Sequence, residues 1–153
     1  MNSLPNSAQW RPRVVMPRLM RPDVWMLAAV VGLVGLGSFG SAFASLFKRH
    51  PLVSRIALCD REPERVAKFA RDPRFQVKFR ATDAFASLDD ICRADLDALV
   101  LITQPWLHAP QAIQAMESGK HVYSAVPVIW MPDADEVLDW CDKVVRTCAR
   151  TGR

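Results

Sequence analysis

The chain has 153 residues, of which 50% are hydrophobic and 24% are charged, values typical of one globular domain that can bury a real core. The formal net charge is +4, but residues 1–27 alone contribute +3, because four arginines there face the single Asp23. No basic face remains in the rest of the chain, which argues against nucleic acid as a partner.

Residues 1–26 are predicted to form an irregular basic extension, because four prolines and four arginines interrupt any regular period. An alternative interpretation is a secretory leader, since the apolar run 24–36 precedes the cleavage-like sequence Ala42-Phe43-Ala44. That run is too short to cross a bilayer, so no membrane partner is expected. Cleavage there would also destroy the glycine motif described below.

From residue 27 onward, short apolar runs alternate with segments of helical periodicity. The predicted strands span residues 28–34, 55–59, 75–79, 96–102 and 121–124. The predicted helices span residues 38–50, 62–70, 84–91, 108–118 and 133–148. This alternation is typical of an α/β protein, and we expect one dinucleotide-binding Rossmann domain over residues 27–153. Its parallel sheet would be doubly wound, with helices on both faces.

The motif Gly35-Leu36-Gly37-Ser38-Phe39-Gly40 lies between the first predicted strand and the first predicted helix. In a dinucleotide-binding unit, Gly35 would permit the tight turn out of the strand and Gly37 would let a pyrophosphate approach the backbone. Gly40 would let the helix pack closely against the strand. The helix N-terminus would then face the pyrophosphate, with the hydroxyl of Ser38 as a further donor.

Asp60 stands 20 residues after Gly40, at the end of the second predicted strand, where it would accept hydrogen bonds from the ribose hydroxyls. A carboxylate there favours NAD, because it repels the 2′-phosphate of NADP. Arg61 keeps NADP open, since a guanidinium can pair with that phosphate or stack on adenine. An ordinary solvated turn residue is the alternative for Arg61.

Four cysteines, Cys59, Cys92, Cys141 and Cys148, form no CxxC pair and no zinc-type spacing with histidine, so we expect no metal site. Cys141 and Cys148 would lie about 10 Å apart along one helix, which is too far for a disulfide. The pattern favours reduced thiols and a cytoplasmic location.

Two further stretches follow predicted strands, at Thr103-Gln104-Pro105-Trp106-Leu107-His108 and around Gly119-Lys120-His121-Val122. Together with the glycine motif and Leu58-Cys59-Asp60-Arg61, they make residues 31–128 resemble the amino-terminal domain of the Gfo/Idh/MocA family of glucose–fructose oxidoreductases and inositol dehydrogenases. The resemblance implies a nicotinamide cofactor and hydride transfer at a CH–OH group of a sugar or cyclitol. It also implies that Thr103 and His108 lie beside the cofactor, although His108 could instead cap a helix or face solvent.

The predicted cofactor-binding residues are Gly35, Gly37, Ser38, Phe39, Gly40, Asp60, Arg61, Thr103, Gln104, Pro105 and His108. Val126 stands where the family carries a lysine expected to assist proton transfer, so the catalytic residues stay unassigned. The family also continues into a substrate domain, which we expect this chain to lack. We therefore expect a cofactor domain that is not active by itself. We also expect it to self-associate through the face that the substrate domain would otherwise cover. The alternative is a free-standing NAD(P)-binding regulatory or assembly module.

Overall fold

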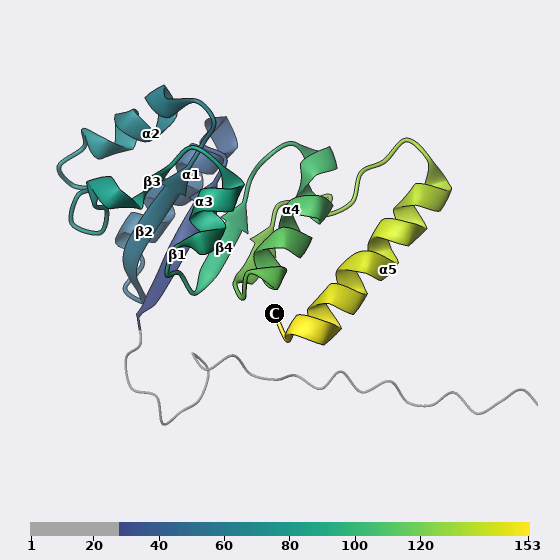
Figure 1. Ribbon diagram of the computed structural model, residues 1–153. Helices are drawn as coiled ribbons and strands as arrows, with labels where there is room; N and C mark the ends of the chain where they lie inside the picture. The colour runs from purple at the N-terminus through teal and green to yellow at the C-terminus, as the bar shows by residue number, and fades with distance from the viewer. Residues whose placement is uncertain (1–27) are drawn as a thin grey trace, which may run out of the picture.

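The computed structural model describes residues 28–153, and the predicted extension 1–26 lies outside this range. A five-stranded sheet forms the centre of the domain (Figure 1), and its strand order is β3-β2-β1-β4-β5 with every pair parallel. The strands are β1 (Ala29–Val34), β2 (Val53–Cys59), β3 (Ala84–Phe85), β4 (Ala98–Leu101) and β5 (His121–Ser124). The chain moves outward from β1 to β3 and then returns to β4 on the other side of β1, so a topological switch point lies between β1 and β4.

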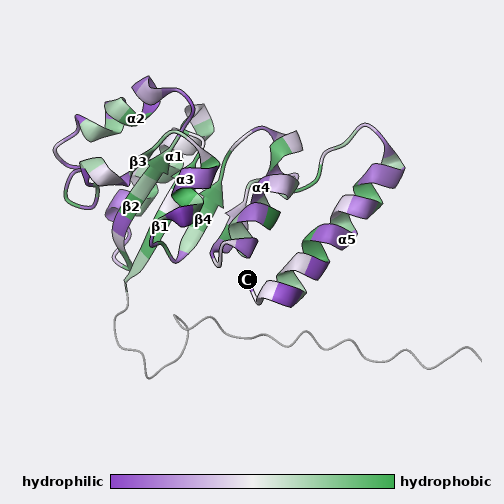
Figure 2. Ribbon diagram, in the orientation of Figure 1, coloured by the Kyte–Doolittle hydropathy of each residue, from purple (hydrophilic) through white to green (hydrophobic). Residues whose placement is uncertain are grey.

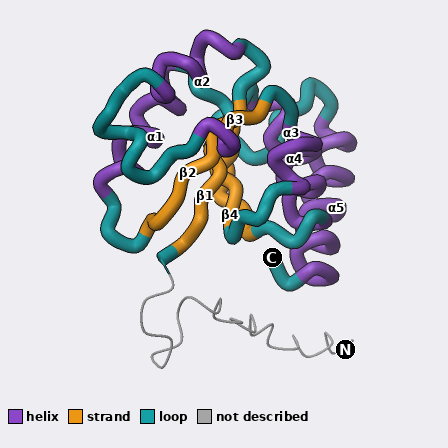
Figure 3. Tube along the Cα trace, turned by 60° about the vertical axis from the view of Figure 1, so that its left-hand side comes forward, coloured by secondary structure: helices purple, strands orange, loops and turns teal. Residues whose placement is uncertain are grey.

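Helices cover both faces of this sheet, as the tube view shows (Figure 3). They are α1 (Ser38–Arg49), α2 (Pro63–Ala70), α3 (Leu88–Arg93), α4 (Pro105–Glu117) and α5 (Ala134–Thr151), with a 3-10 turn η2 (Ala81–Asp83) before β3. One hydrophobic core lies between the sheet and α1 and α2, and it includes Leu33, Ile56 and Val66. The second core includes Leu99 and Ala115 and lies against α3 and α4. The predicted doubly wound Rossmann fold is therefore confirmed.

The third strand is not where the sequence places it. Residues 75–79 were predicted as a strand, but they form successive turns, and β3 is the two-residue segment Ala84–Phe85, which pairs with Leu58 and Cys59. The reason is side-chain spacing, because Phe75 and Phe79 are both buried while Val77 between them is 81% exposed. Burial at a spacing of four follows a turn rather than the two-residue period of a strand.

The same shift moves the following helix. A helix was predicted over 84–91, but α3 begins at Leu88, because Ser87 ends the extended segment as an N-cap. The Ser87 hydroxyl oxygen accepts a hydrogen bond from the backbone N–H of Asp90 at 3.2 Å, the usual way in which serine starts a helix. The predicted helix 108–118 also begins earlier, because Pro105 occupies its first turn. Among residues 28–153, no helix is long and apolar enough to cross a membrane.

Candidate dinucleotide site

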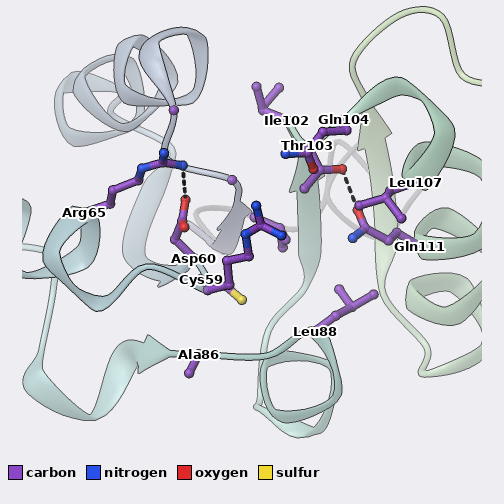
Figure 4. Close-up of a pocket in the computed structure, with 14 residues that line it drawn as sticks. Cys59, Asp60, Arg65, Ala86, Leu88, Ile102, Thr103, Gln104, Leu107 and Gln111 are labelled. Atoms are coloured by element: carbon purple, nitrogen blue, oxygen red, sulfur yellow. Dashed lines mark hydrogen bonds and ion pairs between the residues drawn. The ribbon is translucent and has the colours of Figure 1, made fainter.

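A cleft of about 260 Å³ opens at the carboxyl ends of the central strands, on the switch point between β1 and β4. Ligands of open α/β sheets bind at this place. The lining comes from the loops after β1, β2, β3 and β4, from the first residues of α2 and α3, and from the first two turns of α4 (Figure 4). Of the predicted site residues, the structure brings Gly35, Gly37, Asp60, Arg61, Thr103 and Gln104 together in this lining.

The glycine loop after β1 is tightly constrained at two positions and open at the third. Gly35 has φ +92°, and a Cβ atom there would lie 2.2 Å from the carbonyl oxygen of Ile102. A Cβ on Gly40 would lie 1.9 Å from the carbonyl oxygen of Gly35. A Cβ on Gly37, by contrast, would meet no atom within 4 Å. Gly37 thus keeps its side of the cleft free for a ligand that touches the backbone, as a pyrophosphate does.

The N-terminus of α1 begins at this loop. Its N-cap is Gly37, no side chain caps the first turn, and that turn contains no acidic residue. The first N–H groups of a helix have no partner within the helix, and the helix dipole attracts an anion to them. Ser38 and Phe39, the next two predicted site residues, are both exposed at this end of the helix. The residues present therefore fit a dinucleotide whose pyrophosphate lies on the α1 N-terminus.

Asp60 connects the end of β2 to the glycine loop. Its carboxylate is nearly buried, with 7% of the residue exposed. One carboxylate oxygen accepts a hydrogen bond from the backbone N–H of Leu36 at 2.7 Å. The other oxygen accepts one from the N–H of Glu62 at 2.9 Å. A carboxylate offers about four lone-pair positions, so Asp60 can hold the loop in shape and still accept hydrogen bonds from ribose hydroxyls.

The arginine that forms an ion pair with Asp60 is Arg65, and not the adjacent residue Arg61. An Nη atom of Arg65 lies 3.5 Å from the Asp60 carboxylate, and the other lies 2.9 Å from the carboxylate of Glu62. Figure 4 shows Arg65 reaching from α2 toward Asp60. Arg61 is exposed at the cleft margin. Sequence reasoning missed Arg65, although its position five residues after Asp60 places it in the first turns of the helix that starts beside that carboxylate.

The loop after β4 contributes polar groups to the opposite wall. The Thr103 hydroxyl donates a hydrogen bond to the side-chain amide oxygen of Gln111 at 2.6 Å, and both residues line the cleft (Figure 4). Gln104 is the N-cap of α4, and Pro105 begins the helix. Gln111 was missed in the sequence, where only its place two helical turns after Thr103 could have indicated it.

His108 lies inside α4, behind the cleft wall, and is 1% exposed. Its Nδ1 lies 2.7 Å from the carbonyl oxygen of Pro127, and its Nε2 lies 3.0 Å from the carbonyl oxygen of Thr103. A neutral imidazole has a single N–H and donates to one carbonyl at a time. The ring thus connects the loop after β4 to the segment after β5, and it is not among the residues that line the cleft.

Cys59 lines the floor of the cleft at the end of β2. Burial, followed by the nearby carboxylate of Asp60, raises the pKa of its thiol to about 12. Burial also raises the pKa of Cys92. Because the thiolate is the nucleophile of cysteine, Cys59 is held as an unreactive thiol at neutral pH.

The exposure of the cysteines gives a simple prediction. Iodoacetamide at low protein concentration and neutral pH should alkylate Cys141 and Cys148, which are exposed, much faster than Cys59 and Cys92, which are buried. Intact-mass spectrometry over time should show two early adducts, and peptide mapping should place them. The same reaction in denaturant is the control, in which all four thiols should react together. Early labelling of Cys59 would contradict the buried, protonated state.

The fold and the cleft define this protein as a Rossmann domain of the dinucleotide-binding class. Residues 29–152 match the family described as "Oxidoreductase family, NAD-binding Rossmann fold". The chain therefore belongs to the Gfo/Idh/MocA family, and NAD is the cofactor of this class of domain.

The two curated relatives described next are longer than this chain. A "Glycosyl hydrolase family 109 protein" of Shewanella sp. (strain W3-18-1) is 32% identical over 124 residues, which cover 77% of this chain and 27% of that protein. The "4-carboxy-2-hydroxymuconate-6-semialdehyde dehydrogenase" of Sphingobium sp. (strain NBRC 103272 / SYK-6) is 33% identical over 110 residues, covering 71% of this chain and 33% of that protein. The chain thus spans about a third or less of the relatives that it matches.

Two solved structures are similar in fold. The WlbA dehydrogenase from Bordetella pertussis, in complex with NADH and UDP-GlcNAcA, is 28% identical with a TM-score of 0.65, over 81% of this chain and 35% of that one. The scyllo-inositol dehydrogenase from Lactobacillus casei, with bound NAD(H) and scyllo-inositol, has a TM-score of 0.68 at 22% identity, over 82% of this chain and 34% of that one. The latter likeness concerns the fold alone.

Proposed function

We propose that residues 27–153 form the cofactor domain of an oxidoreductase that acts on a CH–OH group of a sugar- or cyclitol-like substrate. The observation that carries this proposal is the open space beside Gly37 at the uncapped N-terminus of α1, together with Asp60 on the same cleft. Two of the relatives named above support the class of reaction, because both are named dehydrogenases and one of them was solved with NADH and UDP-GlcNAcA.

In this proposal the chain binds and orients the cofactor. The α1 N-terminus and the backbone at Gly37 hold the pyrophosphate. The Asp60 carboxylate accepts hydrogen bonds from the hydroxyls of the adenosine ribose. Thr103 and Gln104 line the other end of the cleft, where the nicotinamide, which supplies the hydride acceptor, would lie. The proposed set is completed by Gly35, Ser38, Phe39, Gly40, Arg61, Pro105 and His108. His108 would act behind the cleft wall, through the carbonyl of Thr103.

We further propose that this chain alone does not catalyse the reaction. Oxidation of a CH–OH group needs a base for the hydroxyl proton. Of the described residues, those that line the cleft around β4 are Ile102, Thr103, Gln104, Leu107 and Gln111, and none of them can accept a proton at neutral pH. Val126, in the position of the family lysine, is exposed and cannot do so either. The substrate and the proton acceptor would therefore be held by groups outside the described residues.

Binding of the four nicotinamide nucleotides by calorimetry tests the proposal. NAD and NADH should bind, and NADP and NADPH should bind more weakly, because Asp60 repels a 2′-phosphate. No heat with any of the four would refute the cofactor site.

Binding without turnover of polyols is also what a free-standing regulatory module would show. Activity restored by a separately added substrate domain would favour the enzyme, and unaided turnover would contradict the proposal that this chain is inactive alone.

The buried free thiols Cys59 and Cys92 support a reducing, cytoplasmic location as part of this proposal.

Substitution of Asp60 probes the choice between the two cofactors. Asp60→Asn removes the charge and weakens the hydrogen bonds to ribose, so NAD affinity should fall by about 10-fold, given that hydrogen bonds to charged groups contribute about 1.5–3 kcal/mol. The affinity for NADP should fall less or rise, because the repulsion of its phosphate is gone. Calorimetry would measure the ratio of the two dissociation constants.

The matched control is Glu64→Gln, which removes one negative charge from the exposed first turn of α2 outside the cleft lining. It should leave both affinities unchanged. An equal loss of NAD and NADP affinity in Asp60→Asn, with an unchanged melting temperature, would contradict a selective role for this carboxylate.

A further inference from the structure

Within residues 28–153, the last helix, α5, is covered on one side only. It packs against α4, and Figure 1 shows it as the outermost helix of the domain, alongside α4. The residues turned toward the domain are Val137, Trp140, Val144, Thr147 and Thr151, which are partly or fully buried. Val144 reaches the second core cluster.

The uncovered side of α5 carries an apolar stripe of five residues: Ala134, Leu138, Cys141, Val145 and Cys148. All five are exposed, Leu138 by 68% and Val145 by 66%. Figure 2 shows apolar segments that recur between polar ones along this helix. The spacing within the stripe alternates between four and three residues, which is the a/d pattern of a helix that pairs with another helix. A single exposed apolar residue needs no explanation, but a continuous stripe indicates an interface.

The charges of α5 and its flanks are separated along the helix. The N-terminal half carries only acidic residues: Asp133, Asp135, Glu136, Asp139 and Asp142. The C-terminal half carries only basic residues: Lys143, Arg146, Arg150 and Arg153. This distribution suits the helix dipole, and it also makes the helix complementary to a second copy of itself that runs in the opposite direction.

We propose that the apolar stripe of α5 is a homodimer interface, in which α5 packs antiparallel against α5 of a second copy of this chain. The two-fold arrangement places each acidic half beside the basic half of the other copy, whereas a parallel pair would place like charges together. The symmetry is closed, so the association ends at a dimer.

The stripe also sets the register. In the stripe, Leu138 and Val145 are a positions, and Cys141 and Cys148 are d positions. In antiparallel pairs an a residue faces a d residue, so Leu138 faces Cys148 of the second copy and Cys141 faces Val145 of the second copy. The pair is then centred on residue 143, and both helices contribute their full length of about 27 Å. This interface lies outside the dinucleotide cleft, since no residue of α5 lines that cleft. It is thus independent of the proposed function.

Sedimentation of the full chain over a concentration series tests the interface. The wild-type chain should dimerise, and Leu138→Asp/Val145→Asp should raise the dimer dissociation constant by roughly 100-fold or more, because it places a charge where each copy would bury an apolar side chain. The matched control is Leu52→Asp/Val77→Asp, which changes two exposed apolar residues elsewhere and should dimerise as the wild type does.

Circular dichroism and NAD titration should show that all three proteins are folded. A wild-type chain that stays monomeric at every concentration would overturn the proposal and leave this face to a different partner. Self-association that persists in Leu138→Asp/Val145→Asp would overturn it as well.

The direction of pairing is tested by oxidative cross-linking of two variants under conditions where sedimentation shows a dimer. In Cys141→Ser the remaining exposed thiols, at Cys148, would be ten residues apart in an antiparallel pair, or about 15 Å, which a disulfide cannot bridge. In Leu138→Cys/Cys141→Ser, the introduced thiol at position 138 faces Cys148 of the second copy. We expect a covalent dimer in the second variant only. A covalent dimer in Cys141→Ser, or in neither variant, would overturn the antiparallel register.

Discussion

Gly40→Val is expected to prevent the domain from folding. Even the first carbon of a side chain at Gly40 would lie 1.9 Å from the carbonyl oxygen of Gly35 and 2.9 Å from its carbonyl carbon. Both atoms belong to the backbone of the turn after β1, so the clash cannot be relieved by a rotamer change. Overpacking of a core costs about 1–3 kcal/mol or more, and here α1 would also have to move away from the central strand. Because a domain of this size is stable by only about 5–15 kcal/mol, we expect loss of the cooperative thermal transition and insoluble expression.

Thermal denaturation followed by circular dichroism would measure this effect. Gly37→Ala is the control in the same loop, because its Cβ meets no atom within 4 Å, and it should melt close to the wild type. A soluble Gly40→Val protein with a wild-type melting temperature would show that α1 does not pack on the loop as described.

Gly37→Val is expected to abolish NAD binding while the fold is retained. The backbone of Gly37 has φ −60° and ψ −172°, an extended conformation that valine adopts readily. Its side chain would extend into the open space that the pyrophosphate is proposed to occupy. The phosphates would then be displaced from the N–H groups of α1, and we expect an affinity loss of at least roughly 100-fold, equivalent to about 2.7 kcal/mol.

Calorimetry with NAD, together with a melting curve, separates the two effects of this substitution. Gly119→Val is not a suitable control, because φ is +83° there. Ser54→Val, on β2 and outside the cleft lining, tests the general effect of valine at an exposed site. Retained NAD affinity in Gly37→Val would place the pyrophosphate elsewhere.

Some features of this domain are local, and the sequence was sufficient to predict them. The glycine motif, the strand before it and the helix after it are set by neighbouring residues, and so are the strands at 55–59 and 121–124. The position of Asp60 at the end of β2 followed from the same local pattern. In each case a run of apolar residues and a turn signal lie within a few positions of each other.

Other features depend on contacts between distant segments. Strand β3 has only two residues, and its pairing with Leu58 and Cys59 gives no periodic signal of its own. The apolar residues of 75–79 indicated a strand, but in the structure Phe75 packs against Phe69 and Phe79, at ring distances of 5.2 and 5.7 Å, in a series of turns. Arg65 and Gln111 reach the cleft from helix turns whose orientation is decided by packing.

The side of α5 that is buried could not be predicted from the sequence either. Within the predicted helix 133–148, helical spacing puts six apolar residues near one stripe: Val137, Leu138, Cys141, Val144, Val145 and Cys148. The structure divides them, with Val137 and Val144 turned toward the domain and the other four exposed. Apolar residues make up half of this helix, so composition alone could not decide which side is covered.

The hydrogen bond from the Leu36 N–H to Asp60 has a consequence for the thermodynamics of binding. The glycine loop is fastened to β2 when the chain folds, so its backbone entropy is lost at that stage and not when a nucleotide arrives. A preorganised loop presents its donors in place, and most of the interaction energy with the phosphates then remains available as affinity. The carboxylate that we propose to distinguish NAD from NADP thus also holds the glycine loop in shape before a nucleotide binds.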